Sequence, residues 1–254
     1  MRAQKLKFLI AVLLIVPFGL IQAQNSNSQA YWVHEDVVKP NMVGEYESVV
    51  KELVANMKKH NIQEVNMIVS NLVGARYLYV GPIENMADLD KSSFATLSEK
   101  MGTDAMGKLF DRMDKCYDIE QDYVIHLEKD LSYMPTGITQ TPEGQDYRKF
   151  HYLHFSPGDR AMIKEKMKAI KDMFVQKGSK EYYRVYKSGF GTRGEFYMVA
   201  VAAKDAVHYA TQSKENDALL GEDGNKTMGD LFSNLLKYEV FEGNMRSEMG
   251  YSPE

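Results

Sequence analysis

The sequence predicts an α+β protein built from two similar halves, each with the element order β-α-β-β-α-β. The stretch from His151 reads HYLHFSPGDRAMIKEKMKAIKDMF and then KEYYRVYKSGFGTRGEFYMVAVAAKDAV, which is typical of strand, Pro-marked turn, helix, strand, Gly-rich turn and strand. A diverged form lies in the first half, as YWVHEDVVKPNMVGEYESVVKELVANM followed by EVNMIVSNLVGARYLYVGPIENMADL. Such internal similarity predicts a tandem duplication.

The helix after each first strand carries the clearest repeat signal. In both halves, apolar residues recur at spacings of four, three and four, which places them on one helical face. At one constant offset the two faces match position by position, and Pro40 matches Pro157. The matched residues are Tyr46, Val50, Leu53 and Met57 in the first half and Ile163, Met167, Ile170 and Phe174 in the second.

The remaining elements follow the same order. Alternating apolar residues predict strands over 31–35, 65–69, 77–80 and 123–127, and a helical pattern runs over 104–117. The segment TGITQTPEGQD, residues 136–146, has the composition of a linker. We therefore expect a first repeat over 31–135 and a second over 147–254. The order β-α-β-β-α-β is the ferredoxin-like arrangement of a four-stranded sheet with two helices on one face.

The face of each sheet opposite its helices is also expected to be apolar. The residues assigned to it are Trp32, Tyr77, Tyr79, Tyr152, Phe196 and Met198. An apolar sheet face needs a partner, and the other sheet is the obvious one. The sequence thus predicts two tandem ferredoxin-like repeats whose antiparallel sheets pack into an α+β barrel.

The first residues have the pattern of a secretory signal peptide. A basic start is followed by the apolar run 8–21, the small residue Ala23 and a polar stretch. The run is shorter than the roughly 20 residues that a spanning helix needs, which disfavours the alternative of a membrane anchor. We expect a signal peptide over 1–23, a flexible leader over 24–30, and an exported protein in the periplasm or the medium.

Charge and cysteine content limit the partners and the mode of stabilisation. The net charge is −4, and cleavage after residue 23 would remove three basic residues. An acidic chain argues against nucleic acid and membrane surfaces as partners. Cys116 is the single cysteine, so an intramolecular disulfide is excluded and a half-buried thiol is expected.

The phrases ARYLYVGPIENMADLDK and GEFYMVAVAAKDAVHYA, together with the Pro after the first strand, resemble the dimeric α+β barrel superfamily. That superfamily includes NIPSNAP-like proteins, antibiotic-biosynthesis-type monooxygenases, EthD-like proteins and chlorite dismutases. The resemblance covers nearly all of residues 31–254 and includes no catalytic signature. It implies that the tandem halves form a monomeric pseudo-dimer, with a homodimer as the alternative.

Candidate site residues come from the ends of the first strands. His34 shares a strand face with Trp32, and His154 with Tyr152. His154 matches His34 only after a short deletion in the turn before the helix. An imidazole beside aromatic rings suits a general base or a ligand contact. The alternative is that equivalent residues of a duplicated chain match by descent, whatever their role. The ligand-binding candidates are His34, Trp32, His154, Tyr152, Tyr79 and Tyr197.

Catalytic and metal motifs do not occur in the sequence. HExxH, CxxC and GxSxG are absent, and the glycines of SGFGTRGEF precede a strand, which indicates a hairpin turn. No metal and no cofactor are predicted. Because members of the resembled superfamily that bind haem use an axial histidine, haem is an alternative, with His126, His34, His154 and His208 as the possible ligands.

Two functions from different classes stay open. The first is an exported binding protein that holds a small apolar or aromatic molecule between its sheets, or a purely structural module. The alternative is a cofactor-independent monooxygenase or isomerase-like enzyme, which the superfamily resemblance implies by analogy. A cavity that contains either histidine would favour a small-molecule ligand or substrate.

Overall fold

The computed structural model describes residues 28–253 of the chain. The predicted signal peptide and most of the predicted leader lie outside the described residues. Ser28, Gln29 and Ala30 are already part of the first strand, so this strand begins earlier than expected. Within the described range, no helix is both long and apolar enough to cross a bilayer.

The first half contains four strands and one helix layer. Its elements are β1 (Ser28–Val38), α2 (Val43–Lys59), β2 (Ile68–Leu72), β3 (Arg76–Ile83), the 3-10 helix η1 (Met86–Asp90), α3 (Ala95–Met101), α4 (Thr103–Met113), η2 (Asp114–Cys116) and β4 (Tyr117–Glu128). The segment expected as one helix over 104–117 is thus a helix followed by a 3-10 turn.

The second half repeats this order of strands and helices. Its elements are β5 (Tyr147–Phe155), η3 (Pro157–Asp159), α5 (Arg160–Lys177), β6 (Tyr183–Ser188), β7 (Glu195–Ala203), α6 (Ala206–Phe232), β8 (Lys237–Met245) and η4 (Ser247–Met249). The Gly-rich segment between β6 and β7 is a turn, as its composition predicts, with Gly191 and Gly194 at positive φ. Common descent of the halves stays a prediction.

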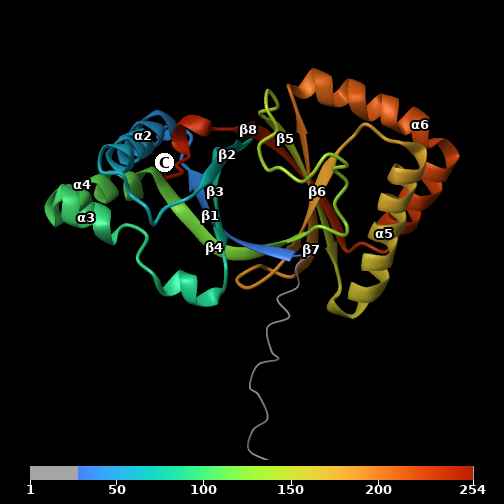
Figure 1. The fold of residues 1–254 in the computed structure, drawn as a ribbon, viewed down its shortest axis with the longest axis horizontal. Helices are drawn as coiled ribbons and strands as arrows, with labels where there is room; N and C mark the ends of the chain where they lie inside the picture. Colours follow the sequence, from blue (N-terminus) through green and yellow to red (C-terminus); the bar gives the residue numbers. More distant parts are fainter. Residues whose placement is uncertain (1–27, 254) are drawn as a thin grey trace, which may run out of the picture.

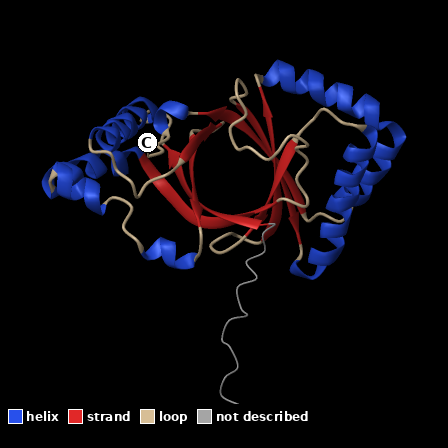
Figure 2. Cartoon of the chain, viewed as in Figure 1, coloured by secondary structure: helices blue, strands red, loops and turns tan. Residues whose placement is uncertain are grey.

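The eight strands form one closed antiparallel barrel in the order β1-β3-β2-β8-β5-β7-β6-β4. The expected fold, two ferredoxin-like repeats whose separate sheets pack on each other, is therefore wrong. The halves join edge to edge, where Ser70–Leu72 of β2 pairs with β8 and Ile125–Leu127 of β4 pairs with β6. Figure 1 and Figure 2 show the strands as a ring, with α2–α4 outside one wall and α5–α6 outside the opposite wall.

Closure has a simple physical cause. Two open sheets would leave four edge strands with unpaired backbone N–H and C=O groups, and a closed barrel leaves none. At the β2–β8 junction the backbones approach so closely that a Cβ on Gly243 would overlap the backbone of Asn71 and Leu72. Periodicity in the sequence identifies apolar faces and carries no information about which edge strands meet.

Side chains of the strands alternate between the barrel interior and the two helix layers. The interior is filled by a buried cluster of Val33, Leu72, Leu78, Tyr123, Ile125, Leu127, Phe150, Tyr152, Tyr186, Phe196, Met198 and Ala200. A second core lies between the first-half sheet and α2 and α4, and a third lies under α5 and α6. The barrel interior is thus a packed core. The expected ligand site lies between the sheets, whereas a large cavity of this protein lies between the first-half sheet and its helices.

The helix faces predicted from periodicity are confirmed, since all eight matched residues are buried. The expected second sheet face is only half correct. Tyr152, Phe196 and Met198 do point into the barrel. Trp32, Tyr77 and Tyr79 lie on the helix side of the first-half sheet, because the odd–even alternation of their strands turns them towards α2 and α4 and away from the barrel interior. Cys116 is fully buried rather than half-buried.

Candidate active site

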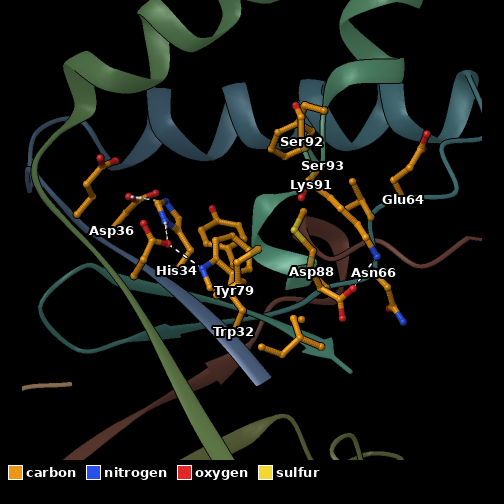
Figure 3. A pocket seen from close by; sticks show the side chains of 18 of the residues that line it. Trp32, His34, Asp36, Glu64, Asn66, Tyr79, Asp88, Lys91, Ser92 and Ser93 are labelled. Atoms are coloured by element: carbon orange, nitrogen blue, oxygen red, sulfur yellow. Dashed lines mark hydrogen bonds and ion pairs between the residues drawn. The ribbon is translucent and has the colours of Figure 1, made fainter. Parts of the chain in front are cut away.

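A cavity of about 970 Å³ lies between the first-half sheet and its helices. One wall is the outer face of β1, β3 and β4, and the others come from α2, α4 and the segment around η1. Figure 3 shows Trp32, His34, Asp36 and Tyr79 at one end of this cavity and Asp88, Lys91, Ser92 and Ser93 at the other. A volume of this size accommodates a drug-sized organic molecule.

Strand alternation brings the polar groups to this wall. Val33 points into the barrel interior. Its even-numbered neighbours on β1, Trp32, His34 and Asp36, therefore point to the opposite face and line the cavity together. The antiparallel register then sets Tyr79 of β3 beside His34 on one side and Asp122 of β4 beside it on the other. Three strands therefore converge on the imidazole.

His34 lies between two carboxylates. Its Nδ1 is 3.0 Å from Oδ1 of Asp122, and its Nε2 is 3.2 Å from Oδ1 of Asp36. The Asp36 side chain is almost fully buried, whereas that of Asp122 is 58 % exposed. Asp122 also accepts a hydrogen bond of 2.9 Å from the indole N–H of Trp32, whose ring stacks on His34.

A chain of hydrogen bonds continues from Asp36 into the core. The hydroxyl of Tyr46 on α2 donates to Oδ2 of Asp36 at 2.5 Å, and the hydroxyls of Tyr46 and Tyr79 are 2.6 Å apart. Because the single hydroxyl proton of Tyr46 is given to the carboxylate, Tyr79 is the donor to Tyr46. The site thus contains a continuous chain of four side chains, from His34 through Asp36 and Tyr46 to Tyr79.

The electrostatics of this chain make His34 a cation at neutral pH. Burial alone would lower the pKa of His34, but the attraction of Asp36 and then of Asp122 outweighs burial and raises the pKa to about 9. For Tyr46, burial first and then Tyr79 and Asp36 raise the pKa far above its ordinary value. Burial likewise raises the pKa of Tyr79. Both tyrosines therefore stay neutral hydrogen-bond donors.

The rest of the cavity wall combines apolar surface with negative charge. The apolar part includes Val65, Leu89, Phe94, Phe110 and Phe190. Carboxylates outnumber cations among the lining residues, with His34 and Lys91 as the described cations. The lining carboxylates are Asp36, Glu64, Asp88, Asp114, Glu120 and Asp122. Such a lining favours a neutral or cationic aromatic molecule over an anionic one.

The structure separates the six predicted ligand-binding residues. Trp32, His34 and Tyr79 line the cavity together. Tyr152 and His154 share the other strand face, which points into the barrel, where Tyr152 is buried and His154 pairs with Glu239 at 2.9 Å. Tyr197 is buried in the core under α5 and α6. The six residues therefore do not form one site.

Four site residues were missed by sequence reasoning, namely Asp36, Tyr46, Glu120 and Asp122. Asp36 follows His34 by two positions, so strand alternation predicts that both side chains lie on one face of the strand. Helical periodicity places the ring of Tyr46 in the core and carries no information about the partner of its hydroxyl. Asp122 lies opposite His34 only through the register of two strands far apart in the sequence, for which the sequence carries no local signal.

Two kinds of cofactor can be tested against these residues. His34, Asp36 and Glu120 offer ligand atoms within 4.8 Å of one another, a donor set that suits a divalent transition metal. Haem needs a free histidine nitrogen that faces the cavity, and both ring nitrogens of His34 already face carboxylates. His126, His154 and His208 are not among the lining residues. Among the described residues, the cavity thus offers no free histidine nitrogen as an axial haem ligand.

Comparison with known proteins gives the fold and no closer relationship. No protein-family model matches the sequence, and no curated protein is significantly similar to it. Among solved structures, an anthrone oxidase-like protein aligns with a TM-score of 0.56 and 11 % identity, covering 86 % of this chain and 91 % of that one. A monooxygenase-like protein of Lactobacillus acidophilus NCFM aligns with a TM-score of 0.51 and 9 % identity, over 86 % and 94 % of the two chains.

A monooxygenase-like protein of Fusobacterium nucleatum aligns similarly, with a TM-score of 0.51 and 11 % identity over 87 % and 93 % of the two chains. At this level of identity the likeness shows the fold alone. The chain therefore shares the fold of these structures, with both barrel halves in one polypeptide and a polar, aromatic-walled cavity in the first half.

Proposed function

We propose that the protein is a cofactor-independent oxygenase or isomerase-like enzyme that acts on a flat, uncharged aromatic compound bound in the first-half cavity. The observation that carries this proposal is the His34–Asp36–Tyr46–Tyr79 chain, which ends in a cavity large enough for such a compound. A passive binding site needs mainly shape and apolar surface with a few polar contacts, whereas here a histidine lies between two carboxylates and is linked to two tyrosine hydroxyls. The names of the three similar structures support the same class.

The chemistry begins with proton removal from the substrate. Asp122 takes the proton of an acidic O–H or C–H group, and the electron pair stays on the substrate as a delocalised anion. The imidazolium of His34, held in place by Asp36, lies beside this anion and stabilises its charge. In the oxygenase reaction, dissolved O2 takes up the electron pair of the anion and, with a proton, forms a substrate hydroperoxide. The hydroperoxide loses water and leaves a carbonyl group that retains one oxygen atom. In the isomerase reaction the proton returns to another atom.

Each remaining polar residue has a defined part in this scheme. Tyr46 and Tyr79 hold the Asp36 side chain in position, because Tyr46 donates a hydrogen bond to Asp36 and cannot itself ionise at neutral pH. Trp32 fixes Asp122 through its indole N–H and offers its ring as a stacking surface. Phe94 and Phe110 exclude water from the opposite side.

Oxygen consumption with a panel of hydroxylated polycyclic aromatics tests this function. We expect the variant His34→Gln to lose roughly 10²–10⁴-fold in turnover, the usual contribution of a positioned acid–base group. His151→Gln is the matched control, because His151 lies under α6 in the other half, with its Nδ1 2.6 Å from the hydroxyl of Tyr238. Equal turnover in the two variants contradicts the proposed role of His34.

The single tryptophan allows binding to be measured apart from turnover. Trp32 lies in the cavity wall, so quenching of its fluorescence reports a ligand directly. We expect His34→Gln to bind aromatic compounds with nearly unchanged affinity. Binding by the wild type without any turnover would instead favour a ligand-binding protein.

A second candidate is a divalent-metal site at His34, Asp36 and Glu120. A metal has to displace the proton from His34, and the pKa of about 9 makes this unfavourable at neutral pH. Equilibrium dialysis against Zn²⁺ and Mn²⁺ at pH 7 and pH 9 tests it. Binding of one equivalent that is lost in Glu120→Gln supports a metal enzyme over the cofactor-independent one.

We also propose that the protein acts outside the cytoplasm, in the periplasm or the medium. The basic start, apolar run and small residue of positions 1–23 support export. Fractionation of the native cells, with N-terminal sequencing of the mature protein, tests this proposal. A protein that starts at Gln24 in an extracytoplasmic fraction agrees with it, and an uncleaved protein in the cytoplasm contradicts it.

A further inference from the structure

Two arginines lie inside the barrel and do not line the cavity of the candidate active site. Arg148 of β5 is 2 % exposed and Arg184 of β6 is 3 % exposed. They occupy the same strand faces as Phe150 and Tyr186, which belong to the interior core. Arginine is almost never this deeply buried unless it is paired with a counter-charge.

The hydrogen-bond partners of the two guanidinium groups are neutral. Arg184 donates to the carbonyl oxygens of Thr139 and Gln140 at 2.6 and 2.9 Å. Arg148 donates to the carbonyl oxygens of Gln140, Tyr147 and Gln145. Within residues 28–253, no carboxylate forms an ion pair with either arginine. Arg76, which also reaches the interior, is by contrast paired with Glu35 at 2.7 Å.

Unsatisfied donors surround a small cavity at this place. A space of about 50 Å³ is lined by Arg148, Arg184, Gln140 and Tyr186, together with apolar neighbours. The Nε of Arg184 and the side-chain nitrogen of Gln140 are buried and have no hydrogen-bond partner among the described residues. Burial and the neighbouring charge of Arg184 both lower the pKa of Arg148, to about 10. The two positive charges therefore repel each other, and Asp146 and Tyr186 offset the effect on the pKa of Arg148 only in part.

We propose that this cavity binds a small inorganic anion, of about the size of chloride or nitrate, between Arg148 and Arg184. The cavity exceeds the roughly 10–15 Å³ that a single water requires. An anion there accepts from the free Arg184 Nε–H and the Gln140 amide, and it neutralises the mutual repulsion of the arginines. The same arginines hold segment 139–147 through its carbonyl oxygens, so the anion also stabilises the connection between the halves.

Bromide provides a direct test on the wild-type protein. In crystals soaked in sodium bromide, we expect an anomalous peak in the cavity beside Arg184 Nε and the Gln140 amide. In solution, the melting temperature in chloride or bromide should exceed that in gluconate at equal ionic strength, and the difference should saturate with concentration. Gluconate is too large for a cavity of this volume.

Two variants connect the effect to the site. Arg184→Gln should remove the difference between halide and gluconate. Arg112→Gln should keep it, because Arg112 is an exposed arginine paired with Glu45 and Glu52 on the helix layer. If Arg184→Gln does not fold, the bromide peak in the wild type decides. Density for water alone in the cavity, with equal melting temperatures in all salts, overturns the proposal.

Discussion

The two halves of the barrel place different side chains at matching positions under their helices. In the first half, His34 pairs across the ladder with Tyr79, and in the second half Leu153 pairs in the same way with Tyr197. Phe155, two residues further along β5, stands where β1 has Asp36. Leu153 and Phe155 are buried in an apolar core, whereas His34 and Asp36 form a charged pair in a cavity wall.

The helix that covers each sheet shows the same contrast between a polar first half and an apolar second half. Tyr46 of α2 supplies a hydroxyl to Asp36, and its matched residue on α5 is Ile163, which is fully buried. Of the four-residue chain, the second half retains only the tyrosine of the third strand. One layout of strands and helices can therefore enclose an apolar core or hold a polar site. The residues at three matched positions, His34/Leu153, Asp36/Phe155 and Tyr46/Ile163, decide between these outcomes.

The largest effect is expected when a residue of the polar half is placed in the apolar half. Leu153→His would bury an imidazole without a carboxylate partner and remove apolar contacts. We expect a loss of about 3–5 kcal/mol in the free energy of unfolding, measured by urea denaturation. Leu153→Met is the control of similar volume, and a loss below about 1.5 kcal/mol is expected for it. Equal stability of both variants would mean that the second half can accommodate a polar group.

The reverse change, His34→Leu, is expected to cost less. Asp36 would keep the hydrogen bond from Tyr46 and lose its nearest cation, at a cost of about 1–3 kcal/mol. Urea denaturation measures this change as well. An unchanged free energy of unfolding at pH 7 would show that Asp36 is not held as a charged partner of His34.

The histidines of the two halves should titrate at opposite ends of the pH range. The pKa of His34 is raised to about 9, whereas burial and then the charge of Lys149 lower the pKa of His151 to about 4. Imidazole resonances in NMR titrations measure both values directly. A midpoint near 6.5 for either histidine contradicts the contrast between the halves.

These shifts have opposite consequences for stability. The stabilisation from protonated His34 is complete below pH 6.5 and is lost as pH rises to about 9, with an upper limit of ~3 kcal/mol. For His151 the folded state binds the proton less well than the unfolded state, so stability falls as pH drops from 6.5 towards 4. Urea denaturation across this range, with His34→Leu and His151→Gln as references, separates the two contributions.

The smallest effect on stability is expected from Asp122→Asn. Its carboxylate is mostly exposed, and an ion pair of this kind contributes less than about 1 kcal/mol. The pKa of His34 should fall below 9 and stay above its ordinary value, because Asp36 remains in place. Turnover should nevertheless be lost, since Asp122 is the proposed proton acceptor. A stability loss as large as that of His34→Leu would assign Asp122 a structural role instead.

The sequence by itself determined the order of elements, the buried faces of α2 and α5, and the presence of a histidine and a tryptophan on one face of β1. These features depend on residues within a few positions of one another, so their spacing reveals them. The shared position of Trp32 and His34 was predicted for this reason. The amphipathic helices were predicted for the same reason, and their eight matched apolar residues are buried.

Tertiary structure alone decided how the sheets join and what surrounds His34. Closure depends on β2 meeting β8 and β4 meeting β6, pairings between strands from different halves of the chain. The register of β4 against β1 brings Asp122 to His34, and the docking of α2 brings Tyr46 to Asp36. The same long-range register turns Tyr152 and His154 into the barrel, away from Trp32 and His34. Because such registers are set by the packing of the whole barrel, no local pattern in the sequence records them.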